Sequence, residues 1–186
     1  MARPTGRPMR EELLDAATEL IQTDGVGALS FGGVGRRVGI AAPSVHHHFR
    51  RRDDLIAAVA DRYRRSFDER LSVIDDATAP NRIRAYALIF QMTADADRSC
   101  PCASLAGAWS DQGSETRRAV ADFFEAQRRW LARQVVVGIA DGDFRNGLDP
   151  DAIAAMILDA LEGALTTSRP RQAGTTTIET MLQLLA

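Results

Sequence analysis

The sequence SFGGVGRRVGIAAPSVHHHF, residues 30–49, decides the fold. Ser30 stands where a helix N-cap is favoured, and Val34 and Val38 are apolar positions of a short helix that ends at Gly39. Residues 42–49 predict a second short helix, because Val45 and Phe49 are spaced i,i+4 on one face. The stretch therefore predicts two short helices joined by a tight turn.

The segments on either side of this stretch also have helical spacing. Residues 10–24 predict a helix with one apolar face, which Asp24-Gly25 ends. Beyond residue 50 we find no strand alternation and no internal repeat, so we expect an all-α fold. The predicted later helices cover residues 53–74, 81–96, 101–109, 114–140, 150–167 and 177–185.

Composition and charge narrow the class of protein. The 186 residues are 45% hydrophobic and 26% charged, as in ordinary globular proteins, and this excludes collagen, disulfide scaffolds and wholesale disorder. No apolar run approaches the length that spans a bilayer, and the N-terminus lacks the apolar core of a secretory signal, so we expect a cytoplasmic protein without a membrane partner. Residues 1–65 hold 11 arginines against 8 acidic residues, whereas residues 66–186 hold 12 against 17. The basic first third indicates a polyanion partner.

A set of spaced residues in the first third resembles the helix-turn-helix of the TetR family of bacterial transcriptional regulators. The resemblance covers about 45 residues without a gap and rests on Ala16-Ala17, Leu20, Gly25, Ser30, Val34, Val38-Gly39-Ile40, Val45, His48-Phe49, Arg52 and Asp54-Leu55. It implies a three-helix DNA-binding domain over 9–54 and a helical effector-binding and dimerisation domain over 55–186. The pattern of residues 100–106, 142–145 and 148–150 looks like a NemR-like subgroup, some of whose members sense electrophiles or oxidants through a cysteine.

Four positions depart from the family pattern. Ala41 stands where a small polar residue commonly caps the second helix, at a cost of about 1 kcal/mol. His46 stands in place of Tyr, Gly35 in place of Ala, and Arg52 in place of Lys. None of these substitutions abolishes the geometry, but the operator sequence does not carry over from relatives.

The predicted recognition helix offers small and polar side chains opposite Val45 and Phe49. Small residues permit close approach to DNA, and serine or histidine can hydrogen-bond to base edges or phosphates. Arginines 50–52 follow at the start of the next helix, where guanidinium groups and the helix dipole attract phosphate. Each residue taken alone is also compatible with an ordinary solvated face. The predicted DNA contacts are Ser30, Ala42, Ser44, His46, His47 and Arg52.

Two further clusters have competing interpretations. Residues His46, His47 and His48 point about 100° apart on a helix and do not converge on one ion, so we predict no metal site. Cys100 and Cys102 are candidate redox sensors, with Arg98 favouring thiolate, or small buried residues at a helix start.

Four hypotheses for the whole chain remain. The leading one is a homodimeric regulator, not an enzyme and without a cofactor, that represses from a near-palindromic double-stranded operator. It dimerises through helices 115–140 and 150–167. It would be released by a small apolar or aromatic effector near Tyr86, Phe90, Trp109, Phe123, Met156 and Asp159. An oxidant-sensing regulator acting through Cys100 is the alternative. Two further hypotheses come from other classes of protein. One is a thiol-dependent redox enzyme, although the sequence lacks a thioredoxin-like pattern. The other is a helical interaction module without DNA binding.

Overall fold

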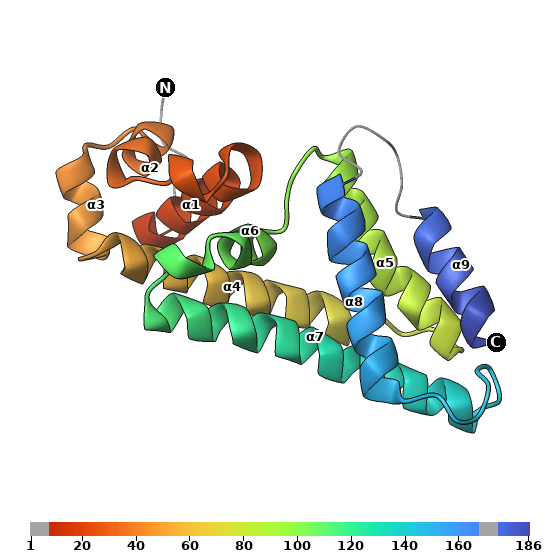
Figure 1. Cartoon of the computed structure of the whole chain (residues 1–186). Coiled ribbons are helices and arrows are strands. Elements are labelled where there is room, and N and C mark those ends of the chain that lie inside the picture. Colours follow the sequence, from red (N-terminus) through yellow and green to blue (C-terminus); the bar gives the residue numbers. More distant parts are fainter. Residues whose placement is uncertain (1–7, 168–174) are drawn as a thin grey trace. The chain divides into compact units, whose positions relative to one another are not determined.

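The computed structural model in Figure 1 describes residues 8–167 and 175–186, and every regular element in them is helical. This confirms the predicted all-α class. No helix in the described part of the chain is long and apolar enough to cross a membrane. The elements are α1 (Met9–Asp24), η1 (Val26–Ala28), α2 (Phe31–Val38), α3 (Ala42–His48), α4 (Arg52–Ser72), α5 (Ala79–Asp95), α6 (Pro101–Gly107), η2 (Trp109–Asp111), α7 (Ser114–Ala140), α8 (Pro150–Thr167) and α9 (Thr175–Leu185).

The chain forms two compact units. Unit 1 comprises the described residues up to Tyr63 together with Pro101–Ala121, and unit 2 comprises Arg64–Cys100 and the described residues from Asp122 onward. Helices α4 and α7 each contribute residues to both units. The compact units divide within α4. This division does not test the predicted domain boundary between residues 54 and 55, which stays a prediction.

Helices α1, α2 and α3 pack in chain order in unit 1, and α6 packs against α1 (Figure 1). The Ser30 hydroxyl caps α2 by accepting a hydrogen bond from the backbone N–H of Gly33 at 3.0 Å. Gly39 ends α2 in the left-handed conformation, with φ +78°. A side chain on Gly35 would place its Cβ 2.6 Å from the carbonyl oxygen of Ile40. The tight turn therefore depends on glycine at both positions.

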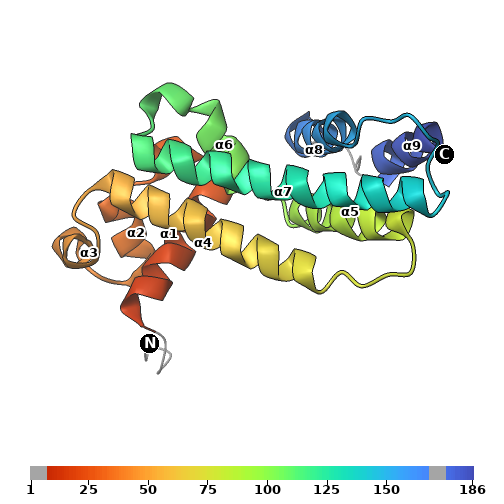
Figure 2. The ribbon, with the colours of Figure 1, turned by 90° about the horizontal axis from the view of Figure 1, so that it is seen from below.

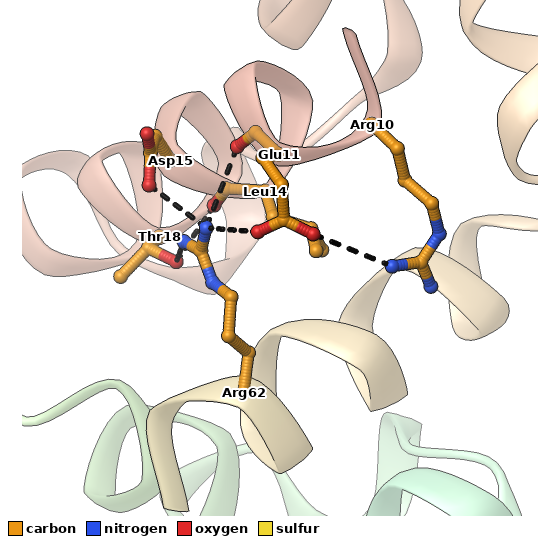
Figure 3. A network of polar contacts seen from close by, with 6 residues as sticks. All are labelled: Arg10, Glu11, Leu14, Asp15, Thr18 and Arg62. Carbon is orange, nitrogen blue, oxygen red and sulfur yellow. Dashed lines mark hydrogen bonds and ion pairs between the residues drawn. The ribbon is translucent and has the colours of Figure 1, made fainter. Parts of the chain in front are cut away.

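Arg62 of α4 fastens that helix to α1 in unit 1 (Figure 3). Its guanidinium donates to Asp15 Oδ1 at 2.8 Å, to Glu11 Oε2 at 3.3 Å and to Thr18 Oγ1 at 3.1 Å. Arg10 lies on the other side of Glu11, at 3.9 Å from Oε1. The network sets the position of α1 on the first half of α4.

Unit 2 has an apolar interior formed by α5, α8 and α9 with the adjoining parts of α4 and α7. Helices α5, α8 and α9 pack against one another, as both views show (Figures 1 and 2). At their surface Arg84 of α5 pairs with Glu179 of α9 at 2.9 Å. The ring of Phe144 covers Gly138, where a Cβ would collide with it. The loop between α7 and α8 is thus held against the end of α7.

The predicted helix bounds agree with the structure to within about two residues. The helices predicted at 114–140 and 150–167 have those bounds. The helix predicted through Trp109 ends instead at Gly107, and a short 3-10 turn, η2, contains Trp109. Glycine is a poor helix former, so the α-helix ends at that residue.

Candidate nucleic-acid interface and effector site

Helix α3 is held on unit 1 by one apolar face. Val45 and Phe49 are both buried, and the Arg10 guanidinium lies over the Phe49 ring at 5.1 Å. The ring of His46 meets Phe31 of α2 edge-on, with 4.4 Å between centroids. These contacts fix the rotation of α3, and so decide which of its side chains face outward.

The outward face of α3 carries the residues predicted to meet DNA. His46 and His47 are exposed, and Ala42 and Ser44 are half-buried. Ala41 begins the helix without a side-chain hydrogen bond, as expected from the missing polar cap. The first turn of α3 is held by the bond from the Ser44 N–H to the Ala41 carbonyl, 2.9 Å.

Ser30 has a structural task at the start of α2. Its oxygen accepts the Gly33 N–H, yet the residue is exposed. Because a hydroxyl is both donor and acceptor, its hydrogen stays available to a phosphate oxygen.

Arg52 is placed differently from the expectation of a phosphate contact. Its guanidinium donates to the carbonyl oxygens of Leu29 at 2.9 Å and Val26 at 2.8 Å. Both carbonyls belong to the segment between α1 and α2. Arg52 therefore links that segment to the start of α4 through hydrogen bonds. The contact between Arg52 and DNA stays untested, but two of its donor nitrogens are occupied within unit 1.

The neighbouring arginines differ from one another in their partners. Arg51 donates to the Asp54 carboxylate at 2.7 Å and 3.0 Å. These hydrogen bonds lower the pKa of Asp54 and raise that of Arg51. Arg50 is exposed, and its side chain donates no hydrogen bond to another described residue.

Arg36 of α2 is an exposed cation that the sequence analysis left out. Its neighbour Arg37 is tied to Glu19 at 3.0 Å and Asp24 at 2.9 Å, whereas Arg36 forms no ion pair within residues 8–167 and 175–186. The signal was present in the sequence. Val34 and Val38 mark the buried face of α2, and a residue midway between them projects to the other side.

Three of the six predicted effector residues meet in the interior of unit 2. Tyr86, Phe90 and Phe123 are all buried. Phe67 lies 5.5–6.2 Å from each of these three rings, and Trp130 stacks on Tyr86 at 5.5 Å. The Tyr86 hydroxyl donates to Gln127 Oε1 at 2.6 Å, while the Gln127 Nε2 donor is buried without a partner.

The other three predicted effector residues lie elsewhere. Trp109 belongs to unit 1, is 44% exposed, and has the Arg117 guanidinium 5.6 Å from its ring centre. Met156 is 41% exposed and Asp159 is exposed, both on the outer side of α8. Helical spacing did not distinguish these residues from ones that face the interior. For Met156 and Asp159 the reason is that α8 is apolar around much of its circumference.

Both cysteines are buried, and neither forms a disulfide within the described residues. Cys100 lies beside Glu162 of α8, a residue that the sequence analysis missed. Both carboxylate oxygens of Glu162 are buried, and among the described residues only the weakly donating Cys100 thiol interacts with them. Burial raises the pKa of this carboxyl to about 7, and the Cys100 thiol partly offsets the rise. The signal in the sequence was a glutamate within the apolar run of α8.

The described residues contain no group of three or more histidine, cysteine or acidic side chains arranged to hold a metal ion. The absence of a metal site at His46–His48 remains a prediction for the protein in solution.

Comparison with known families identifies both parts of the chain. Residues 13–59, which contain α2 and α3, match the bacterial regulatory proteins of the tetR family. Residues 79–181 match the tetracyclin repressor-like C-terminal domain. The chain belongs to the TetR family. It is therefore a helix-turn-helix regulator of transcription that binds DNA, and the predicted family is confirmed.

Individual relatives agree with this assignment. A TetR-family transcriptional regulator from Agrobacterium tumefaciens has a TM-score of 0.87 at 25% identity, with 95% of this chain and 97% of that chain covered. The nucleoid occlusion factor SlmA from Marinobacter nauticus is 26% identical over 148 residues, 78% of this chain and 74% of that protein. Relatives of both chain halves are regulators rather than enzymes.

The NemR-like subgroup is not established. Reduced NemR from E. coli has a TM-score of 0.82 and covers 96% of this chain and 98% of its own, but at 18% identity the likeness is one of fold alone. The TetR family thus stands, while the sensing role of Cys100 receives no support from this neighbour.

Proposed function

We propose that this TetR-family chain is a dimeric repressor. Helix α3 of each protomer reads half of a near-palindromic operator in the cytoplasm, and a small effector bound in unit 2 releases the DNA. The observation that carries the proposal is the outward face of α3. Buried Val45 and Phe49 dock the helix, while His47 stands exposed on its free side and His46, also exposed, lies against Phe31 of α2. A second helix presented in this way enters the major groove in helix-turn-helix proteins.

The roles at the DNA follow from the chemistry and exposure of each side chain. Ala42 allows close approach, and Ser44, His46 and His47 meet base edges or phosphates. The Ser30 hydroxyl donates to a phosphate at the start of α2. Arg36 and Arg50 supply positive charge to the phosphate backbone of the DNA. Arg52 positions the segment before α2.

The proposed dimer uses α7 and α8. The exposed side of α8 carries Met156 with the small residues Ala152 and Gly163, and Val136 of α7 is 54% exposed. Exposed apolar side chains beside small residues permit close helix approach, which suits a four-helix bundle made by two protomers.

The proposed effector is a small molecule with an apolar or aromatic body. Tyr86, Phe90 and Phe123 would line its site in unit 2, together with Phe67 and Trp130. Trp109, Met156 and Asp159 are left out of this site because of their positions in the structure. Effector binding would favour a dimer whose α3 helices no longer match the half-site spacing.

The alternative trigger is oxidation of Cys100. Reactive cysteines are partly exposed and lie in electropositive surroundings, whereas Cys100 is buried and lies beside a carboxyl group. We therefore favour the non-covalent effector. In cells, the variant Cys100→Ser/Cys102→Ser should still respond to the native inducer; a variant that stays bound to DNA with intact fold and ligand affinity would establish the cysteines as the sensor.

The test of the function is a gel shift against genomic fragments, followed by footprinting. We expect sequence-specific shifts and protection of two half-sites. Met156→Arg should give monomers by light scattering and lose the two-half-site operator, while Val73→Arg, at an apolar residue that is 77% exposed just beyond α4, should remain dimeric. A chain that gives no sequence-specific shift would be an interaction module instead, and a monomeric wild type would refute the dimer.

A further inference from the structure

The carboxyl group of Glu162 is buried in surroundings that give it neither a strong hydrogen-bond donor nor a balancing positive charge. Both oxygens are buried, and among the described residues only the weakly donating Cys100 thiol interacts with them. The neighbouring residues on α8, Leu158, Leu161 and Leu165, are buried apolar side chains. Burial of a carboxyl group without strong hydrogen-bond partners destabilises the fold, and more so when the group is ionised. The site therefore favours any molecule that brings hydrogen-bond donors to these oxygens.

The residue beside Glu162 is a poor complement to it. The Cys100 thiol is a weak hydrogen-bond donor and carries no charge that would balance a carboxylate. No arginine or lysine is paired with Glu162 among the described residues, although ion pairs hold Arg84 and Arg129 of the same unit to other acids.

Aromatic rings belong to the same compact unit. Helix α5, which packs against α8, carries Tyr86 and Phe90; Phe67 contacts both rings, and Trp130 stacks on Tyr86. The faces of aromatic rings attract cations, most strongly when water is excluded. An apolar interior with a carboxyl group and several ring faces is suited to a positively charged, apolar molecule, and it disfavours an anion.

Building on the effector site proposed above, we infer that Glu162 is the charge-pairing anchor for a cationic effector: an amine whose ammonium group donates to the Glu162 carboxylate and whose apolar body lies among the aromatic residues of unit 2. The ammonium supplies both the opposite charge and the donors that the two oxygens lack.

Three probes of matched size test this inference on the full-length protein. Phenylbutylamine, phenylbutanol and phenylbutyrate share one apolar body and differ in the charge of the head group. Titration calorimetry should show saturable binding of the amine, about tenfold tighter than the alcohol, and the weakest binding for the acid. In Glu162→Gln the preference for the amine over the alcohol should disappear.

The matched control is Glu69→Gln, the same substitution at an exposed carboxylate of α4 within unit 2, and it should keep the preference. Glu162→Gln removes a buried charge and should fold, as circular dichroism would check. Absence of saturable amine binding, equal affinity for amine and alcohol in the wild type, or an amine preference that survives Glu162→Gln would each overturn the inference. A gel shift on the same samples separates this failure from failure of the proposed function, because sequence-specific operator binding does not depend on the probe.

Discussion

The helix-turn-helix and the interior of unit 2 are organised in opposite ways. In α2 and α3, the cap, the turn and the docking residues lie within residues 30–49, and no side-chain polar atom described there is buried without a partner. The interior of unit 2 brings together Phe67, Tyr86 and Phe123 from three helices, and it leaves Gln127 Nε2 and the Glu162 oxygens without strong partners. The difference teaches that the helix-turn-helix depends on local, satisfied contacts, whereas the interior of unit 2 has buried polar groups without strong partners, for which a ligand is a physical explanation.

The largest effect expected from this contrast is a pH-dependent one at Glu162. Its pKa is raised from 4.5 to about 7 by burial, so the folded protein keeps a proton that the unfolded chain releases. The resulting stability is present below pH 4.5 and is lost as the pH rises to about 7, a fall of roughly 3 kcal/mol in the free energy of unfolding.

Urea unfolding at pH 5 and pH 8 measures most of that fall. Glu162→Gln should lack it and should be more stable than the wild type at pH 8, while Glu69→Gln, at an exposed carboxylate of α4, should retain it. Identical pH dependence in Glu162→Gln and the wild type would mean that the carboxyl is solvated, and would remove the contrast between the two regions.

A second prediction sharpens the account of the helix-turn-helix. A Cβ at Gly35 would lie 2.6 Å from the Ile40 carbonyl, whereas at Gly32 the nearest atom is the Arg36 guanidinium at 3.6 Å. Gly35→Val should therefore destabilise unit 1 by at least about 2 kcal/mol more than Gly32→Val, and should weaken operator binding. Urea unfolding and gel shifts on both variants test this; equal losses would show that the turn tolerates a side chain.

The smallest expected effect separates two arginines that lie close together in the sequence. Arg50→Ala should lower the salt dependence of DNA binding by about one counterion and leave stability unchanged, because Arg50 is exposed. Arg52→Ala should keep the salt dependence and lower the free energy of unfolding by about 1 kcal/mol, because its bonds to Leu29 and Val26 are lost. Binding titrations across a salt series distinguish them, and a reduced slope in Arg52→Ala would restore its contact with phosphate.

The sequence was informative wherever the determinants are local. Ser30, Gly39 and the pair Val45 and Phe49 predicted the two helices and their turn, since a cap, a left-handed glycine and i,i+4 spacing act within a few residues. Long amphipathic stripes also predicted α7 and α8 to within a residue.

The sequence was uninformative where the partner lies far along the chain. The Arg52 guanidinium donates to carbonyls 23 and 26 residues away. Local sequence patterns therefore did not predict that these donors already have partners. The same holds for α8, whose apolar residues cover most of its circumference. Periodicity alone did not show that Met156 faces outward or that the Glu162 carboxyl is buried.

The central claim, that the outward face of α3 reads bases, is tested most directly by selecting binding sites from a random DNA library with the wild type, Ser44→Ala, His47→Ala and Arg50→Ala. The account predicts a near-palindromic sequence for the wild type, and a changed base preference at a position in each half-site for Ser44→Ala or His47→Ala, each altered contact amounting to about 1–3 kcal/mol. Arg50→Ala should select the wild-type sequence with weaker binding. An unchanged base preference in both α3 variants would contradict the claim.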